Sequence, residues 1–334
     1  MIQSPQHIAV IGAGAWGTAL AMAARRAGRD VLLWARDGAL AARINTHHEN
    51  PDYLPGVRLD AAIRASADVP EAAACDAVLF AVPAQHVRTI AGTFAAALAD
   101  DRPVVVCAKG IERSTGALMS EVLAEVLPGR PVAVLSGPTF AGEVARGLPT
   151  AVTLAASDAA LAAALAEALG SRTFRPYVSD DPLGAQIGGA VKNVIAIACG
   201  IVAGRSLGAN AGAALITRGL AEIARLGEAI GARRETLMGL SGLGDLTLTC
   251  TSTQSRNFTL GQALGAGQTL GQALAGRHTV AEGLHSAAAV VSLAAKHGVE
   301  APISAGVAAI LEENASIDET IAALLARPFT AEAR

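Results

Sequence analysis

Residues 8–20 join a short apolar run, a Gly-x-Gly-x-x-Gly turn and the start of an alanine-rich helix. In this pattern Gly12 permits a tight turn, Gly14 lets phosphate groups approach the backbone, and Gly17 lets the helix pack closely on the strand. The N–H groups at the start of such a helix are suited to binding an anion. A tight turn without a ligand is the simpler interpretation. The position of the motif, at the first strand of an alternating series, favours dinucleotide binding.

Apolar runs alternate with helical stretches as far as about residue 181, and long helical stretches follow. Such alternation indicates a parallel sheet covered on both faces. We therefore expect an α/β protein with an N-terminal Rossmann-like, doubly wound sheet (residues 1–181) that binds a dinucleotide and an all-α C-terminal domain (residues 182–334) that binds substrate. The expected strands are Ile8–Ile11, Val31–Trp34, Ala77–Val82, Val104–Ala108, Val132–Leu135, Ala151–Leu154 and Thr173–Val178. The expected C-terminal helices are Leu183–Ala203, Ala211–Ile230, Ala281–His297, Ser304–Glu313 and Ile317–Ala326.

The composition argues against several classes of protein. A formal net charge of −3 over 334 residues provides no basic surface for nucleic acid. Uncharged apolar stretches fall short of the roughly 18 residues expected of a membrane span, and the first strand begins too early for a signal peptide. The four cysteines lack Cys-x-x-Cys spacing and the seven histidines form no metal-like cluster. We expect a cytoplasmic enzyme that holds no metal.

Lysine is rare in this chain, since only Lys109, Lys192 and Lys296 occur among 26 basic residues. Arginine cannot replace lysine where a compact ammonium must fit or must release a proton. Lys109 follows an apolar run, and Lys192 has apolar neighbours around most of a helical turn, which are poor places for a solvated charge. Codon bias, with the ammonium groups turned outward, is the alternative. Lys296 precedes His297 and Gly298 and matches an ordinary helix C-terminus.

Lys192 is the candidate proton donor and acceptor. Reduction of a carbonyl with a nicotinamide cofactor needs a group that supplies a proton, and the reverse reaction needs a base. Burial in apolar surroundings would lower the pKa of Lys192 and suit it to both roles. Asp245, which follows Gly244, is the candidate carboxylate that orients the lysine. A turn residue bonded to its own backbone is nearly as good an interpretation of Asp245.

Two further polar segments are candidate ligand sites. Ser255, Arg256 and Asn257 combine a hydroxyl, a planar cation and an amide, which suit a phosphate. A capped turn before a helix is the alternative. Gly137 and Thr139 follow a predicted strand, and ligands of open α/β sheets bind beyond the carboxyl ends of the strands. These segments are expected to converge on one cleft between the two domains.

The cofactor preference depends on the residues after the second predicted strand. Asp37 stands at about the spacing of the acid that bonds the ribose hydroxyls of NAD. Arg36 could instead hold a ribose 2′-phosphate through its planar guanidinium. We favour acceptance of NADP(H), with NAD(H) as a further candidate. Two solvated loop charges are the simpler alternative.

In chain order and over essentially the whole length, these motifs resemble those of bacterial-type NAD(P)-dependent glycerol-3-phosphate dehydrogenases. The resemblance is carried by Gly12–Gly17, Lys109-Gly110, Ser136–Thr139, Gly188–Asn193, Gly244–Leu246 and Gln254–Asn257. It implies reversible reduction of dihydroxyacetone phosphate to sn-glycerol 3-phosphate, which feeds glycerophospholipid synthesis in the cytoplasm. It also implies that Lys192 accepts the proton in the oxidation direction.

The resemblance implies two sets of site residues. It places substrate beside Lys109, Gly137, Thr139, Lys192, Asp245, Ser255, Arg256 and Asn257. It places the cofactor beside Gly12, Gly14, Ala15, Trp16, Gly17, Arg36, Lys109, Ala141, Arg256, Val280 and Glu282. By themselves, Val280 and Glu282 indicate only a helix start with an acid in its first turn. Many relatives have Ser where this chain has Ala15, so one hydroxyl contact to the pyrophosphate is lost while the backbone donors remain.

Two alternatives stay open at this stage. Another β-hydroxyacid-type dehydrogenase would pair a similar fold and lysine with a carboxylate substrate, which Arg256 also suits. A nucleotide sensor without catalysis would need the glycine turn but no buried lysine. No motif determines the oligomeric state, and a homodimer formed through the helical domain is compatible with the sequence.

Overall fold

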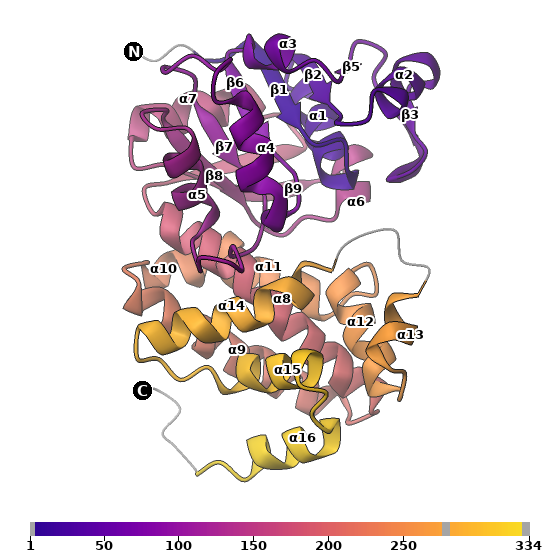
Figure 1. Cartoon of the computed structure of the whole chain (residues 1–334), viewed down its shortest axis with the longest axis vertical. Helices are drawn as coiled ribbons and strands as arrows, with labels where there is room; N and C mark the ends of the chain where they lie inside the picture. Colours follow the sequence, from indigo (N-terminus) through magenta and orange to yellow (C-terminus); the bar gives the residue numbers. More distant parts are fainter. Residues whose placement is uncertain (1–3, 276–280, 329–334) are drawn as a thin grey trace.

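The computed structural model describes residues 4–275 and 281–328. Figure 1 shows two stacked parts, with a sheet and its covering helices above and a bundle of helices below. The chain completes the sheet part before it enters the bundle, and the long helix α8 (Pro182–Gly204) is the first element of the bundle. This arrangement matches the predicted α/β class with a helical C-terminal region.

The main sheet has eight strands in the order β10-β9-β8-β7-β6-β1-β2-β5. After the edge strand β5 the chain crosses back past β2 and β1 to β6, so the carboxyl ends of β1 and β6 lie next to each other at the point where the strand order reverses. That point is where open α/β sheets bind ligands. The strands are β1 (His7–Ile11), β2 (Asp30–Trp34), β5 (Arg64–Ser66), β6 (Ala77–Phe80), β7 (Val104–Val106), β8 (Val132–Ser136), β9 (Thr150–Ala155) and β10 (Phe174–Ser179).

The sheet departs from the prediction in two respects. The expectation of an all-parallel sheet was wrong for one pair, because β9 runs antiparallel to β8 while β10 runs parallel to β9. An apolar run gives the same pattern in either direction, so its residues carry no sign of this reversal. The prediction also missed β5 and a separate antiparallel pair, β3 (Glu49–Asn50) and β4 (Leu54–Arg58), since these short strands contain Asn, Pro, Gly and Arg.

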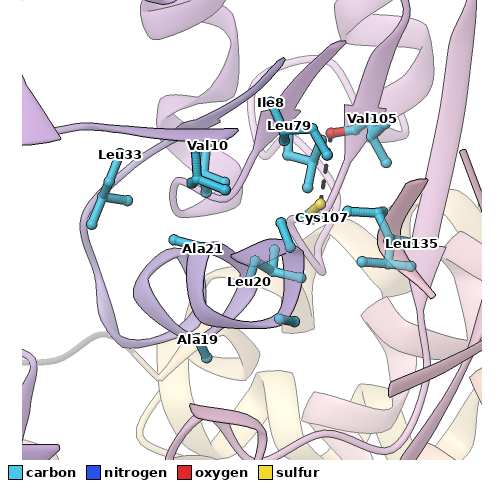
Figure 2. Close-up of a cluster of buried hydrophobic side chains, with 14 of the residues drawn as sticks. Ile8, Val10, Ala19, Leu20, Ala21, Leu33, Leu79, Val105, Cys107 and Leu135 are labelled. Carbon is cyan, nitrogen blue, oxygen red and sulfur yellow. Dashed lines mark hydrogen bonds between the residues drawn. The ribbon is translucent and has the colours of Figure 1, made fainter. Parts of the chain in front are cut away.

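Alternation along each strand divides the sheet core into two layers. In β1, Ile8 and Val10 face the layer of α1, α2, α6 and α7, whereas Ala9 and Ile11 face the layer of α3, α4 and α5. Figure 2 shows the first layer, where Leu20 of α1 lies beneath Val10 and Leu79. The helices are α1 (Ala15–Arg26), α2 (Gly38–His47), α3 (Val69–Ala73), η1 (Ala84–His86), α4 (Val87–Phe94), α5 (Met119–Val126), α6 (Ala141–Ala145) and α7 (Ala159–Leu169).

Helix α8 is the core of the lower part, and every residue from Gly184 to Ile201 is buried. It contacts α9, α11, α12, α14 and α15. By length and hydropathy α8 could cross a membrane, but most of that stretch is buried inside the protein. The other elements are α9 (Ala209–Ala229), α10 (Arg234–Leu237), η2 (Leu240–Gly244), α11 (Asp245–Cys250), α12 (Arg256–Gly265), α13 (Leu270–Leu274), α14 (Glu282–Lys296), α15 (Pro302–Glu312) and α16 (Ile317–Leu325).

Glycines on both partners bring α12 unusually close to α8. A Cβ added at Gly200 of α8 would overlap the carbonyl oxygen of Phe258, and one added at Gly261 of α12 would overlap that of Ile197. Gly204 and Gly265 repeat this arrangement one turn further along each helix. We call these four residues the glycine seam. The seam sets the position of the start of α12, where the sequence places its candidate phosphate site.

Candidate active site

The glycine turn has the geometry that a dinucleotide requires. Gly12 has φ of +110°, and a Cβ there would lie 2.8 Å from Cγ1 of Val82, while a Cβ at Gly17 would overlap the carbonyl oxygen of Gly12. A Cβ at Gly14 would meet no atom within 4 Å, so space is open above this residue. Helix α1 begins at Ala15 with no side-chain cap and no acid in its first turn. These residues therefore fit a pyrophosphate at the helix N-terminus.

The two charged residues after β2, Arg36 and Asp37, differ in the contacts that their side chains make. Asp37 caps α2, since its Oδ1 accepts a hydrogen bond of 2.8 Å from the backbone N–H of Ala39. Arg36 is exposed at the end of β2, on the same edge of the sheet as the glycine turn. Arg36 is thus the residue of this pair whose side chain is better placed to reach a ligand.

Lys192, Asp245 and Lys109 form a buried cluster between the two parts of the molecule. Nζ of Lys192 donates to Oδ1 of Asp245 at 2.6 Å, and Nζ of Lys109 donates to Oδ2 of the same carboxylate at 2.7 Å. Asp245 is fully buried and the Lys192 side chain is 6% exposed. One carboxylate therefore balances two ammonium groups, one from the loop after β7 and one from α8. The alternative of Asp245 as a simple turn residue does not account for these contacts.

The surroundings of Lys192 adjust its proton affinity. Burial lowers its pKa to about 8, because the charged form loses hydration, and the nearby charge of Lys109 acts in the same direction. The Asp245 carboxylate opposes this shift by favouring the charged form. A lysine with this pKa can release and recover its proton near neutral pH.

Thr249 completes the surroundings of Lys192 and was not among the predicted residues. Its Oγ1 accepts from Nζ of Lys192 at 2.7 Å and donates to the backbone carbonyl of Asp245 at 2.6 Å. The signal that could have identified it is its spacing, since Thr249 lies one helical turn after Asp245 on α11.

The segment after β8 meets the same cluster. Nζ of Lys109 also donates to the backbone carbonyl of Gly137 at 2.8 Å and lies 3.3 Å from Oγ1 of Thr139. Ala141 starts α6 immediately after this segment and packs against the core beneath α1. The predicted convergence of Lys109, Gly137 and Thr139 with Lys192 is thus present in the structure.

Both interpretations of the segment before α12 are compatible with the structure. Ser255 caps α12 by accepting from the N–H of Phe258 at 3.2 Å, as the alternative proposed. Asn257 is buried and bridges two elements: it donates to Oδ1 of Asn193 and accepts from the N–H of Gly283, both at 2.9 Å. Its side chain therefore holds neighbouring elements in place. The N-terminus of α12, with Arg256 as its first residue, is the kind of helix end that suits an anion.

Glu282, at the start of α14, faces the sheet part of the molecule. Its Oε1 accepts from the N–H of Ala84 at 3.3 Å, and its Oε2 is buried without a partner among the described residues. Burial raises the pKa of Glu282 to about 7, although the Ala84 N–H and the charge of Arg256 favour the ionised form. Trp16 likewise has a buried Nε1 without a described partner. Val280 lies outside the described residues.

Within residues 4–275 and 281–328, no three His, Cys, Asp or Glu side chains are arranged to hold a metal ion. The Lys192 cluster holds one buried acid, Asp245, between two lysines, Lys109 and Lys192. This arrangement is suited to proton transfer next to an anionic substrate.

Comparison with known protein families agrees with this geometry. Residues 7–162 match the family described as NAD-dependent glycerol-3-phosphate dehydrogenase N-terminus. Residues 181–322 match the corresponding C-terminus family. Together the two matches cover most of the chain and include the glycine turn and the lysine cluster.

Individual relatives cover nearly the full length. The glycerol-3-phosphate dehydrogenase [NAD(P)+] of Parvibaculum lavamentivorans is 59% identical over 98% of both chains. That of Rhodospirillum rubrum is 60% identical over 99% of this chain and 95% of its own. The solved glycerol-3-phosphate dehydrogenase of Coxiella burnetii superposes with a TM-score of 0.92 at 38% identity, covering 97% of this chain and 99% of its own. The chain therefore belongs to the NAD-dependent glycerol-3-phosphate dehydrogenase family and is an NAD(P)-dependent oxidoreductase.

Proposed function

We propose that Lys192 carries the proton in the reversible reduction of dihydroxyacetone phosphate to sn-glycerol 3-phosphate. The observation that supports this role most directly is the buried Lys192 ammonium, 2.6 Å from Asp245, with a pKa near 8. In reduction, Lys192 gives its proton to the carbonyl oxygen that becomes the alcohol. In oxidation, the neutral amine takes the proton back.

The remaining residues position the reactants around this lysine. The bound nicotinamide supplies or accepts the hydride. Asp245 and Thr249 hold the Nζ of Lys192 in one place, which preserves its direction toward the substrate oxygen. The proposed substrate contacts are Lys109, Gly137, Thr139, Lys192, Asp245, Ser255, Arg256 and Asn257, with the phosphate at the N-terminus of α12.

The proposed cofactor contacts follow the edge of the sheet from the glycine turn to α14. They are Gly12, Gly14, Ala15, Trp16, Gly17, Arg36, Lys109, Ala141, Arg256, Val280 and Glu282. The division into a cofactor domain (1–181) and a substrate domain (182–334) accompanies this assignment. A cytoplasmic enzyme that supplies glycerophospholipid synthesis is the biological role we propose, and a homodimer formed through the helical domain is compatible with it.

Replacing Lys192 tests the proton transfer. We expect Lys192→Met to lower kcat for dihydroxyacetone phosphate by roughly 10²- to 10⁴-fold, because a positioned acid is lost while the apolar stem still fills its space. Steady-state kinetics and circular dichroism give the measurement. Lys296→Met, at the last turn of α14, is the matched control and should keep normal turnover. Near-normal turnover in Lys192→Met would refute the assignment.

Arg36 tests the cofactor preference. We expect Arg36→Ala to weaken NADPH binding by on the order of tenfold and to leave NADH nearly unchanged, since only NADPH carries the 2′-phosphate that the guanidinium would pair with. Fluorescence titration of each nucleotide measures the two Kd values. Equal losses for both nucleotides would remove Arg36 from the 2′-phosphate site.

A further inference from the structure

A buried asparagine outside the predicted site contacts the glycine turn directly. Asn50 ends the short strand β3 and is fully buried. Its Nδ2 donates to the carbonyl oxygen of Ala13 and to Oγ1 of Thr18, both at 2.8 Å. Its Oδ1 accepts from the N–H of Tyr53 at 3.3 Å. The amide is thus satisfied at both ends, and the two acceptors around Nδ2 determine its orientation.

The contact with Ala13 determines the direction of a neighbouring donor. The carbonyl of Ala13 and the N–H of Gly14 belong to one planar trans peptide, in which they point in opposite directions. Asn50 holds the carbonyl on the protein side, so the N–H of Gly14 points away from it. No atom lies within 4 Å of a Cβ placed at Gly14, so the backbone there borders open space. The N–H of Gly14 donates no hydrogen bond to any of the described residues.

The contact with Thr18 secures the same turn from the helix side. Thr18 is fully buried on α1, and its own N–H donates to the carbonyl of Gly14 at 2.9 Å. Asn50 therefore joins the peptide before Gly14 to the first turn of α1. The hairpin β3–β4 carries Asn50 and is closed by its own bonds, including one from the N–H of Gly56 to Glu49 at 2.7 Å. In Figure 1 this hairpin lies beside α2 at the edge of the sheet part.

The geometry points to Asn50 as a positioning residue for the cofactor: it orients the Gly14 peptide and the start of α1 toward the pyrophosphate of NAD(P)H. This inference rests on the glycine turn being the dinucleotide site, as proposed above. The side chain of Asn50 bonds to Ala13, Thr18 and Tyr53 and to no residue of the lysine cluster, so it acts on binding of the nucleotide and not on proton transfer. The pyrophosphate is common to both nucleotides, so Asn50 contributes equally to NADH and NADPH.

The test replaces Asn50 by its isostere. Asn50→Asp keeps the shape but offers only acceptors, so it repels the Ala13 carbonyl and adds negative charge beside the anion site. We expect the Kd values of NADH and NADPH, titrated by nucleotide fluorescence without substrate, to rise by the same factor, on the order of tenfold to a hundredfold. The KM for dihydroxyacetone phosphate at saturating nucleotide should stay unchanged. A structural defect alone would lower the unfolding midpoint without this selective effect.

Asn45→Asp is the matched control. Asn45 also makes two side-chain bonds to one backbone residue, both at 2.8 Å to Ala65, but it does not touch the glycine turn. We expect its Kd values to remain near those of the unchanged protein. If Asn50→Asp fails to fold, Thr18→Val replaces it, since valine cannot accept from Nδ2 of Asn50; a smaller rise in both Kd values is expected.

Three outcomes would overturn the inference. They are unchanged Kd values in folded Asn50→Asp, unchanged Kd values in folded Thr18→Val where the first variant does not fold, or a loss confined to one of the two nucleotides. Failure of the proposed function would look different. The unchanged protein would then not reduce dihydroxyacetone phosphate, whether or not Asn50 affected nucleotide binding.

Discussion

Lys192 combines an ionisable group with almost complete burial, and this combination explains its altered proton affinity. An isolated buried ammonium is costly, so its carboxylate and hydroxyl partners are required for stability. Asp245 and Thr249 supply them from one helix, α11. Asp245 is shared with Lys109, so it stabilises the charged form of Lys192 less than it would in an exclusive ion pair. For this one residue, burial and the charge of Lys109 favour loss of the Lys192 proton, whereas Asp245 favours its retention.

This balance predicts a pH dependence. The folded pKa of Lys192 is about 8, below the ordinary value of 10.5, so the neutral amine accumulates as the pH rises through about 8. In the proposed role of Lys192, oxidation of glycerol 3-phosphate needs the neutral amine, and we expect its kcat/KM to rise through that pH and then level. Reduction needs the charged form, so its kcat/KM should fall over the same range. Measurements above about pH 7 keep the substrate phosphate as a dianion. A flat profile in both directions would contradict the assignment.

The sequence singled out the two charged residues at the centre of the cluster, Lys192 and Asp245, but not their polar neighbours. Rarity and apolar neighbours drew attention to Lys192, and the two glycines just before Asp245 drew attention to that residue, because both signals are local. Thr249 and Asn50 were missed, since a threonine on a helix and an asparagine in a polar loop are common. Their importance depends on contacts 57 and 37 residues away along the chain.

At the scale of the element, the glycine seam shows how helix packing sets the active-site geometry. Backbone carbonyls of α8 and α12 approach positions where any other residue would place a Cβ. Side chains can move to relieve such an overlap, but backbone atoms can do so only if a helix shifts. The seam therefore fixes the distance from the start of α12 to Lys192.

A single methyl group tests the seam. We expect Gly261→Ala to lower the free energy of unfolding by about 1–3 kcal/mol, because its Cβ would overlap the Ile197 carbonyl. It should also raise the KM for dihydroxyacetone phosphate. Gly212→Ala on α9 is the matched control: its Cβ would meet no atom within 4 Å, and alanine should stabilise the helix by up to about 1 kcal/mol. Urea unfolding and kinetics supply the measurements, and similar effects in both variants would contradict this role.

Elements with strong periodicity were predicted well, and short or reversed ones were not. The long apolar helices α8 and α9 begin within two residues of their expected starts. The direction of β9 was missed because it depends on the path of the segment that joins β8 to β9, and not on the residues of the strand itself. The β3–β4 hairpin was missed because it is held by the side chain of Asn50 and by contacts with α2 and α6, and neither of these produces a periodic sequence pattern.

At the scale of the whole molecule, the lysine cluster depends on both parts of the fold. Lys109 comes from the sheet part and Lys192 from the helical part, and they share Asp245. Lys109 lowers the pKa of Lys192 through its charge. Any separation of the two parts would therefore change the protonation of the lysine as well as its position.

Removing the second lysine should reveal this dependence. In Lys109→Met the repelling charge is lost and Asp245 is free to pair with Lys192 alone, so both effects favour the charged form. We expect the pH midpoint of glycerol 3-phosphate oxidation to move above that of the unchanged enzyme, alongside a raised KM. The pH profile at saturating substrate measures it. A midpoint that stays in place, or moves down, would show that Lys109 does not influence Lys192.

The buried position of α8 has a consequence for biosynthesis. The helix leaves the ribosome before α9, α11, α12, α14 and α15, which together cover it in the finished protein. Before these helices are made, the apolar residues of α8 lack the partners that cover them, and the cover is complete only when α15 ends at Glu312. The nascent chain is thus most prone to aggregation between the synthesis of α8 and that of α15, and truncation before Glu312 should be far more harmful than the number of residues removed would suggest.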